Sequence, residues 1–204
     1  MIQFNNQNDW KIIQYQGHSI KAAYSNLGKV WEKESPVPPT PTFDGKFKLI
    51  LNDSSVVTAQ CDSTSAITSL DTNKYHNNLV SIEIGLCVNQ ISDFAFSSCS
   101  AMTSVTIPNS VTTIGKQAFY RDSGLTTVTI PDSVTSIGIS AFCGCNALTS
   151  ITIKATTPPT LDDEECGVFG NTNDCPIYVP AASVDAYKSA SSWSNYISRI
   201  QAIQ

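Results

Sequence analysis

Cysteine is the residue type here with the widest choice of chemistry, because a thiol can form a disulfide, bind a metal or attack a substrate. The seven cysteines stand at positions 61, 87, 99, 143, 145, 166 and 175. Their spacing lacks the two ligand pairs of a zinc site, and Cys143-Gly144-Cys145 is not the Cys-x-x-Cys redox motif. We therefore expect no metal site, and we predict small, buried, reduced thiols in a reducing compartment. Cys166 and Cys175 are the one pair whose loop could close into a disulfide, although free thiols are favoured there too.

Histidine and acidic residues give no recognisable catalytic arrangement. His18 and His76 are far apart in the sequence, and neither stands near a nucleophile and a carboxylate in a triad-like order. The acidic run Asp162-Asp163-Glu164-Glu165 lacks the spaced oxygen ligands of a calcium loop, and no glycine-rich phosphate loop is present. A hydrolase would need a pocket that joins His76 or this acidic run to a nucleophile. We expect no catalytic residue and no cofactor.

Charge and hydropathy exclude two classes of partner. The formal net charge is −5, and the 12 Lys and Arg residues are scattered, whereas nucleic-acid binding needs clustered positive charge. No apolar run reaches the roughly 20 residues that a membrane span requires, so we expect no membrane insertion. The polar start, Met1 to Trp10, does not have the pattern of a secretory signal peptide.

A repeat of constant length organises the middle of the chain. Its strand-like element recurs with a 23-residue period, as Ile82-Glu83-Ile84, Val105-Thr106-Ile107, Val128-Thr129-Ile130 and Ile151-Thr152-Ile153. Further apolar columns keep the same interval, among them Ile91, Ile114 and Ile137, and Phe96, Phe119 and Phe142. One short strand per unit at a fixed period predicts a solenoid, in which each unit buries its apolar face against its neighbours.

Each unit is predicted to turn one set of side chains inward. In the strand, Val105 and Ile107 face the interior while Ser104 and Thr106 face solvent, because side chains alternate along a strand. Gly115 and Gly138 are expected to supply turns with positive φ. The following Ala-Phe pair begins a single helical turn that places the ring inside.

The repeat also constrains the cysteines. Cys99 and Cys145 share a column two units apart, with Asp122 between them. Their Cα atoms should lie about 9.5 Å apart, and a disulfide rarely tolerates more than about 7 Å. We therefore exclude this pair.

The fold class expected from these patterns is α/β and β-rich, with capped ends. Residues 1–34 form a small strand-rich module, and residues 35–42 form a proline-rich linker. Residues 43–204 form the repeat domain. Within it we expect a hairpin cap over 43–78, repeats over 79–153 and a strand-helix-strand cap over 154–204, with Trp193 and Tyr196 as anchors and a last strand over Ile197 to Ile203.

The repeated motif resembles a known family. The segments Thr103 to Phe119 and Leu125 to Phe142 are similar to BspA-like leucine-rich repeats, which abound on the surfaces of gut and oral anaerobic bacteria. The resemblance implies a cell-surface or secreted protein that acts in adhesion or protein binding. Without the resemblance, a cytoplasmic or phage-particle location stays open.

Two surfaces are candidates for partner binding. One is the exposed strand face, on which the resemblance implies binding; its residues are Ser81, Glu83, Ser104, Thr106, Thr127, Thr129, Ser150 and Thr152. The other is formed by Tyr120 and Arg121, where the middle unit departs from its neighbours with side chains typical of binding hot spots. The expected function is non-enzymatic recognition of a protein or glycan. The alternative is a structural or assembly spacer of a phage-like or surface particle, docked by its N-terminal module.

Overall fold

The computed structural model describes residues 11–15, 18–25, 28–30, 45–61, 65–68, 72–162, 164 and 166–204. Contacts between residues divide the chain into two units, residues 1–41 and 42–204. In the first unit, β1 (Lys11–Tyr15), β2 (His18–Ser25) and β3 (Gly28–Val30) form an antiparallel sheet. The predicted proline-rich linker, residues 35–42, lies outside the described residues.

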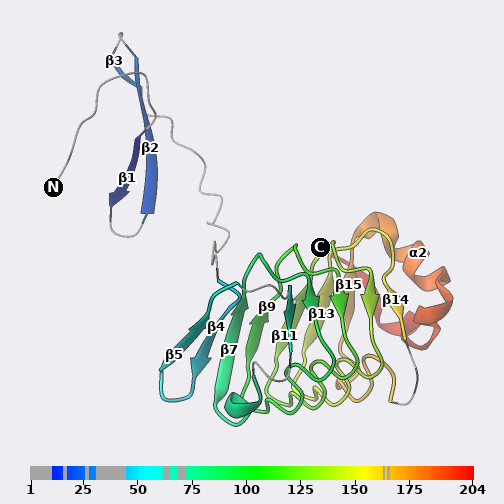
Figure 1. Ribbon diagram of the computed structural model, residues 1–204. Coiled ribbons are helices and arrows are strands. Elements are labelled where there is room, and N and C mark those ends of the chain that lie inside the picture. Colours follow the sequence, from blue (N-terminus) through cyan, green and yellow to red (C-terminus); the bar gives the residue numbers. More distant parts are fainter. Residues whose placement is uncertain are drawn as a thin grey trace. The chain divides into compact units, whose positions relative to one another are not determined.

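The second unit is built from strands that lie side by side along its length (Figure 1). One face carries a sheet in the order β5-β4-β7-β9 and a sheet in the order β11-β13-β15-β16. The other face carries the sheet β14-β12-β10-β8-β6. The strands of the first face are β4 (Phe47–Leu51), β5 (Val56–Ala59), β7 (Leu79–Ile84), β9 (Ser104–Thr106), β11 (Thr127–Ile130), β13 (Ser150–Ile153), β15 (Ile177–Val179) and β16 (Ile200–Ala202). Those of the second are β6 (Ala66–Ile67), β8 (Gln90–Ile91), β10 (Thr113–Ile114), β12 (Ser136–Ile137) and β14 (Thr160–Leu161).

The strand register follows the interval read from the sequence. Ile82 lies opposite Val105, Val128 lies opposite Ile151, and Ile114 lies between Ile91 and Ile137 in parallel pairs. In each pair the partners are one repeat apart. The β-rich α/β class is confirmed, since the described part holds many short strands and few helices.

A column of stacked rings fills the interior. The ring centroids are 5.1 Å apart between Phe96 and Phe119, 5.0 Å between Phe119 and Phe142, and 5.7 Å between Phe142 and Phe169. All four rings are fully buried. Trp193 extends the column at 6.0 Å from Phe169, so the C-terminal segment completes the core of the last turn.

The turns correct one prediction. Gly115 and Gly138 do not have positive φ; the left-handed positions include Phe94, Gln117 and Ser140. Glycine is required for close approach instead, because a Cβ on Gly115 would lie 2.5 Å from Asp93 Oδ1. A Cβ on Gly138 would likewise lie 2.6 Å from the backbone nitrogen of Lys116. The preceding unit occupies that space.

The two ends of the second unit differ from its middle. At the start, β4 pairs antiparallel with both β5 and β7, and a short 3₁₀ helix, η1 (Asn73–Tyr75), precedes β7. At the end, η2 (Ala181–Ser183), α2 (Val184–Ser189) and η3 (Ser191–Arg199) lie between β15 and β16. The strand predicted over Ile197 to Ile203 is shorter, because residues 191–199 form the 3₁₀ helix that brings Trp193 and Tyr196 into the core.

Candidate partner-binding surfaces

The eight predicted strand-face residues form two rows across neighbouring strands. Ser81 pairs with Ser104 and Glu83 with Thr106 between β7 and β9. The rows resume between β11 and β13, where the four partners are Thr127, Ser150, Thr129 and Thr152. All eight side chains are exposed or half-buried and alternate with inward-facing residues such as Ile82, Val128 and Ile151. The fold therefore brings them together on one outer face of the strands.

The register extends these rows to residues that sequence reasoning did not select. Lys48 lies opposite Glu83, Ile50 lies opposite Ser81, and Tyr178 lies opposite Thr152. Alternation within Phe47–Leu51 could have identified the first two. Tyr178 could not be found from the period, because its separation from Thr152 along the chain is longer than one repeat.

The second predicted pair, Tyr120 and Arg121, lies on the turn side of the unit. The guanidinium carbon of Arg121 is 5.0 Å from the centroid of the Tyr120 ring, which is a cation–π distance. Arg121 is exposed and Tyr120 is half-buried. Arg121 also has a left-handed backbone, at φ 59°.

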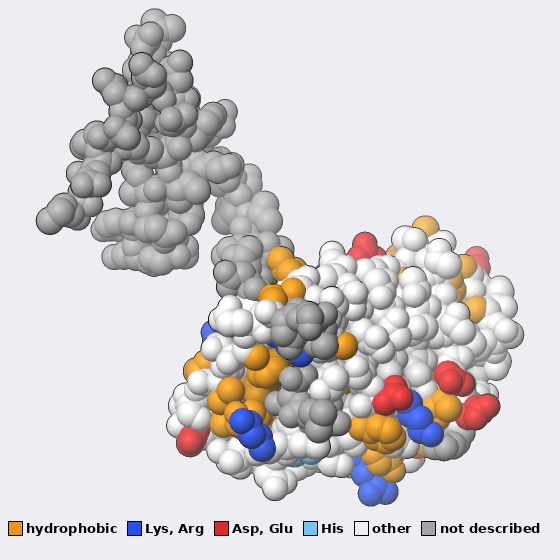
Figure 2. Space-filling view, viewed as in Figure 1, with side chains coloured by type: hydrophobic (Ala, Val, Ile, Leu, Met, Phe, Trp, Pro, Cys, Tyr) orange, Lys and Arg blue, Asp and Glu red, His pale blue; other side chains and the backbone are white. Residues whose placement is uncertain are grey.

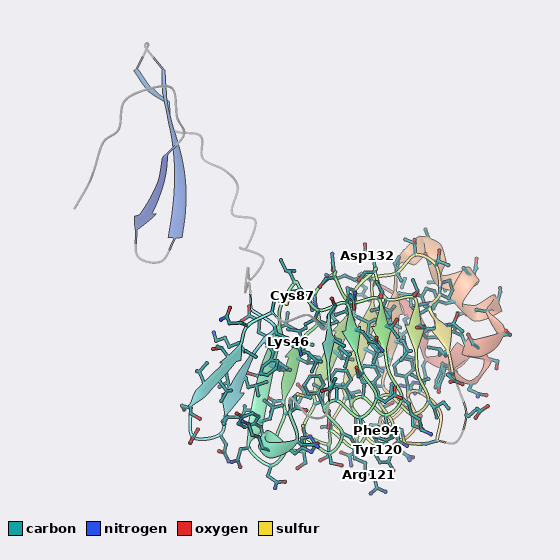
Figure 3. All side chains as sticks on the ribbon, in the orientation of Figure 1. Lys46, Cys87, Phe94, Tyr120, Arg121 and Asp132 are labelled. Carbon is teal, nitrogen blue, oxygen red and sulfur yellow. A yellow bond between two sulfur atoms is a disulfide. The ribbon has the colours of Figure 1, made fainter. Side chains whose placement is uncertain are left out.

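Phe94 belongs to the same surface. Its amide donates to Lys116 O at 2.9 Å, and the amide of Ser98 donates to Tyr120 O at 2.7 Å, so the turns that carry Phe94 and Tyr120 lie against each other. Phe94 is 43% exposed, and its φ is 58°. Figure 3 shows Phe94, Tyr120 and Arg121 at one edge of the turns, and Figure 2, in the same orientation, shows hydrophobic and basic side chains there. We call these three residues the turn surface.

A signal for Phe94 was present in the sequence. Gln117 and Ser140 hold the corresponding place in the next two units, and both are polar. A phenylalanine in a column that is otherwise polar is the signal that could have identified this residue. The structure adds that Phe94 has a left-handed backbone, which bulky residues seldom adopt.

The cysteine prediction is wrong for four of the seven residues. Disulfides join Cys61 to Cys87 and Cys143 to Cys166, with Cα atoms 6.1 Å and 6.2 Å apart. The remaining cysteines, at positions 99, 145 and 175, are free and buried, so the loop between Cys166 and Cys175 is not closed by a disulfide. Cys143 and Cys166 are 23 residues apart, which is one repeat interval, so the period carried a signal for this pair that sequence reasoning did not use. Cys61 and Cys87 are 26 residues apart and do not follow the interval.

A buried carboxyl group interrupts a column of thiols. Asp122 is fully buried between Cys99 and Cys145, and its Oδ1 accepts a hydrogen bond from the Cys99 amide at 2.8 Å. Its Oδ2 has no hydrogen-bond partner. Burial raises the pKa of this carboxyl well above its usual 3.8, and burial followed by the nearby Asp122 also raises the pKa of Cys99. These groups are shielded from solvent, so they contribute to the core and do not form a surface site.

A polar cavity of about 630 Å³ lies at the C-terminal end, lined by Arg199 and by residues of the loop 166–176. Arg199 is largely buried and donates to Cys175 O at 2.9 Å, to Phe169 O at 3.0 Å and to Thr172 Oγ1 at 2.9 Å. The guanidinium of Arg199 therefore stabilises the loop 166–176 through these hydrogen bonds.

Tyr196 closes the same end of the unit. Within the repeats an amide of one turn donates to a carbonyl of the following turn, as Phe142 N does to Val168 O. The amide of Phe169 instead donates to Tyr196 Oη at 3.3 Å. Tyr196 thus replaces the acceptor that a following turn would have supplied.

The histidines considered as catalytic candidates, His18 and His76, lie in different units of the chain. Burial lowers the pKa of His76, and its Nε2 has no hydrogen-bond partner; the side chain of His18 lies outside the described residues. Within the described ranges, no group of three or more His, Cys, Asp or Glu side chains is arranged to hold a metal ion. No helix in those ranges is long and apolar enough to cross a membrane.

When the chain is compared with models of protein families, one family matches. Six copies of the sequence pattern described as BspA type Leucine rich repeat region match residues 64–185, which is more than half of the chain. A search of curated proteins found no match. The matched residues include the turn surface and all eight predicted strand-face residues.

Proposed function

Because this chain belongs to the BspA-type leucine-rich repeat family, we propose that it acts by recognition, as a non-enzymatic adhesion protein that binds a protein or glycan. Membership of the family supports a protein-interaction or adhesion role, since leucine-rich repeats generally serve as binding scaffolds. The proposal involves no catalytic residue, cofactor or metal.

The proposed scaffold is a short solenoid of regular units closed at both ends. Parallel pairing of strands that lie one repeat apart supports the units. Antiparallel pairing of β4 with β7 supports the hairpin as the first cap. The burial of Trp193 and Tyr196 against Phe169 supports the C-terminal segment as the second cap. Exposed ends of a repeat array need such caps for solubility.

The observation that carries the proposed binding site is the exposure of Phe94 beside the Tyr120–Arg121 pair. Aromatic and arginine side chains dominate the energetics of protein interfaces. An aromatic ring can also pack on the apolar face of a sugar, while a guanidinium donates to carboxylate or hydroxyl oxygens. The turn surface therefore offers both an apolar anchor and a directional donor.

The strand face is the second candidate. Its two rows of hydroxyl side chains present a regular, nearly uncharged surface, with Lys48 and Glu83 on neighbouring strands toward one end and Tyr178 toward the other. Threonine also favours strands for packing reasons, so its presence there is explained without a partner. Extended repeat surfaces of this kind suit large partners.

Two matched variants separate these surfaces. Phe94→Ser with Arg121→Ser removes the anchor and the donor of the turn surface. Thr106→Lys with Thr129→Lys adds two charges to the strand face without touching the core. Each variant would be compared with the unaltered chain for binding to a glycan array and to proteins extracted from host-cell surfaces and from bacterial lysate, after thermal unfolding has shown that it is folded.

Loss of binding by at least 10-fold in the first variant alone would support the turn surface. Loss in the second variant alone would move the site to the strand face. Binding that survives in both variants but disappears when residues 1–41 are removed would contradict the proposal. That result would favour the alternative, a spacer docked by its N-terminal module.

A further inference from the structure

The two disulfides lie toward opposite ends of the repeat array. Cys61–Cys87 joins the segment after β5 to the turn after β7, and Cys143–Cys166 joins the last regular unit to the longer turn that follows it. The ends of a repeat array are where unfolding begins, because an end unit has a neighbour on one side only. The two disulfides are therefore located at the ends of the array, where local unfolding costs the least free energy.

At the N-terminal end of the array, the Cys61–Cys87 disulfide reinforces a set of backbone hydrogen bonds. Lys46 N donates to Ala59 O at 2.7 Å, and Gly85 N donates to Lys46 O at 3.0 Å. A Cβ on Gly85 would lie 1.5 Å from Gly45 O, so the turn after β7 packs directly on the start of the hairpin. Figure 3 shows Lys46 and Cys87 at this same corner. Breaking the disulfide would remove the covalent tie between the hairpin and this turn.

At the second end the disulfide fixes a turn that departs from the period. Phe142 and Phe169 stack although their separation along the chain exceeds the interval between Phe119 and Phe142. Three of the four additional residues lie between Leu161 and Phe169, in a segment that begins with acidic residues and contains Cys166. A longer, charged turn loses more conformational entropy on folding, and a cross-link to Cys143 reduces that loss.

The other three cysteines are protected from exchange. Cys99 and Cys145 are fully buried, and Cys175 is 4% exposed. Burial also raises the pKa of the Cys99 and Cys145 thiols, which suppresses the reactive thiolate form. Every cysteine of the chain is thus either bonded or inside the core. This division is typical of proteins that mature where thiols are oxidised.

We propose that residues 42–204 mature in an oxidising compartment, where the disulfides Cys61–Cys87 and Cys143–Cys166 lock the two ends of the array, and that reduction loosens these ends while the central units stay folded. The inference concerns compartment and redox response, and it does not depend on which surface binds a partner. It replaces the reducing compartment predicted from the sequence.

The chemistry requires an external oxidant. Each bond forms when two thiols lose two protons and two electrons to a disulfide of an oxidising enzyme or of oxidised glutathione, which becomes two thiols. Reduction reverses the step. Dithiothreitol attacks the disulfide through its thiolate, releases both protein thiols and ends as a cyclic disulfide, so electrons and protons balance.

The first experiment counts thiols in the full chain produced with export to the bacterial periplasm. Alkylation after denaturation, without reductant, should label three of the seven cysteines, and prior reduction should raise the number to seven. Peptide mapping should find the two bonded pairs. Labelling of all seven cysteines without reductant, or pairing of other residues, would overturn the proposal.

The second experiment follows hydrogen exchange of the same protein with and without dithiothreitol. Amides in residues 45–61, 85–91, 139–145 and 166–175 should exchange at least 10-fold faster after reduction, whereas those in 105–130 should change little. The thermal midpoint should fall by roughly 5 to 15 °C. Unchanged exchange at both ends, or equal acceleration along the whole array, would contradict a lock confined to the ends.

Two double variants assign each effect to one bond. Cys61→Ser with Cys87→Ser should loosen only the first end without reductant, and Cys143→Ser with Cys166→Ser only the second. In each variant, reductant should have no further effect at the altered end and its full effect at the other. If a variant fails to fold, reduction of the unaltered chain still tests the same bond.

Discussion

Asp122 shows how one residue can depart from its column at a cost in stability. The units on either side place Cys99 and Cys145 at this position, and the Cys145 thiol donates to Phe119 O at 3.0 Å. Asp122 instead buries a carboxyl group with one oxygen unpartnered. An ionised carboxylate there would be desolvated, so the folded state favours the protonated form.

Burial of the Asp122 carboxyl should make the stability of the protein depend on pH, and Asp122→Asn should remove that dependence. The pKa of Asp122 is raised in the folded state above the value of 3.8 expected when unfolded. Its contribution to stability is therefore fully present below about pH 3.8 and is lost as pH rises toward the folded pKa. Asparagine keeps an acceptor for the Cys99 amide and does not titrate. The free energy of unfolding of the variant minus that of the unaltered chain should be near zero at about pH 4.

Above that pH the difference should grow, by up to about 1.4 kcal/mol per pH unit. Urea unfolding of both proteins between pH 4 and pH 8 measures it, and other titrating groups cancel in the comparison. A difference that is constant with pH would mean that Asp122 ionises normally in the folded protein.

The phenylalanine column gives a second prediction at the residue scale. Phe119→Ala removes a fully buried ring from between two others and should lower the free energy of unfolding by about 3 to 5 kcal/mol. Thr106→Ala is the matched control on the exposed strand face and should change it by less than about 0.5 kcal/mol. Chemical denaturation distinguishes them. Equal losses would mean that the inside and outside faces are wrongly assigned.

At the scale of the element, each unit depends on how closely its turn approaches the preceding one. Successive turns are joined by bonds such as Phe119 N to Ala141 O at 2.8 Å and Phe96 N to Ala118 O at 2.7 Å. The strands contribute parallel ladders on two faces. A side chain at Gly138 would separate backbones that these bonds hold together.

Gly138→Ala should therefore destabilise the protein by about 1 to 3 kcal/mol, because its Cβ would lie 2.6 Å from Lys116 N. Gln117→Gly is the contrasting control. Gln117 has φ 51°, so glycine relieves the left-handed strain while adding freedom to the unfolded chain, and the two effects nearly cancel. Thermal unfolding of both variants is the measurement. A neutral Gly138→Ala would show that the units can separate without loss.

At the scale of the whole molecule, residues 42–204 hold a continuous core. It extends from Phe47 to Ile200 and includes the aromatic column together with the C-terminal rings. Residues 1–41 form a separate unit. The stability of the larger unit should therefore not require the smaller one.

A shortened chain of residues 42–204 should unfold within about 2 °C of the thermal midpoint of the corresponding transition in the full chain. Cooperativity should be retained, because the core and both disulfides remain. Differential scanning calorimetry of the two chains checks this. A fall of about 10 °C or more would show that residues 1–41 stabilise the repeat unit.

The sequence by itself determined the features that depend on local period and alternation. The constant interval between repeats predicted which side chains share a column, and the register of Ile91, Ile114 and Ile137 agrees with it. Alternation in the strands predicted that the eight polar residues share a face. These features are readable because neighbouring units are nearly identical, so one unit's environment is repeated in the next.

Only the tertiary structure decided the features that arise where the period ends or where backbones meet. The pairing of Cys61 with Cys87 spans 26 residues, which is not a repeat interval, and it depends on how the turn after β7 packs on the start of the hairpin. The role of Gly115 depends on the distance to the preceding unit, which no single unit encodes. Phe94 joins Tyr120 and Arg121 on one surface because adjacent turns stack, although the residues lie in different units. Contacts between units are set by three-dimensional proximity, and the spacing of residue types along the chain does not specify them.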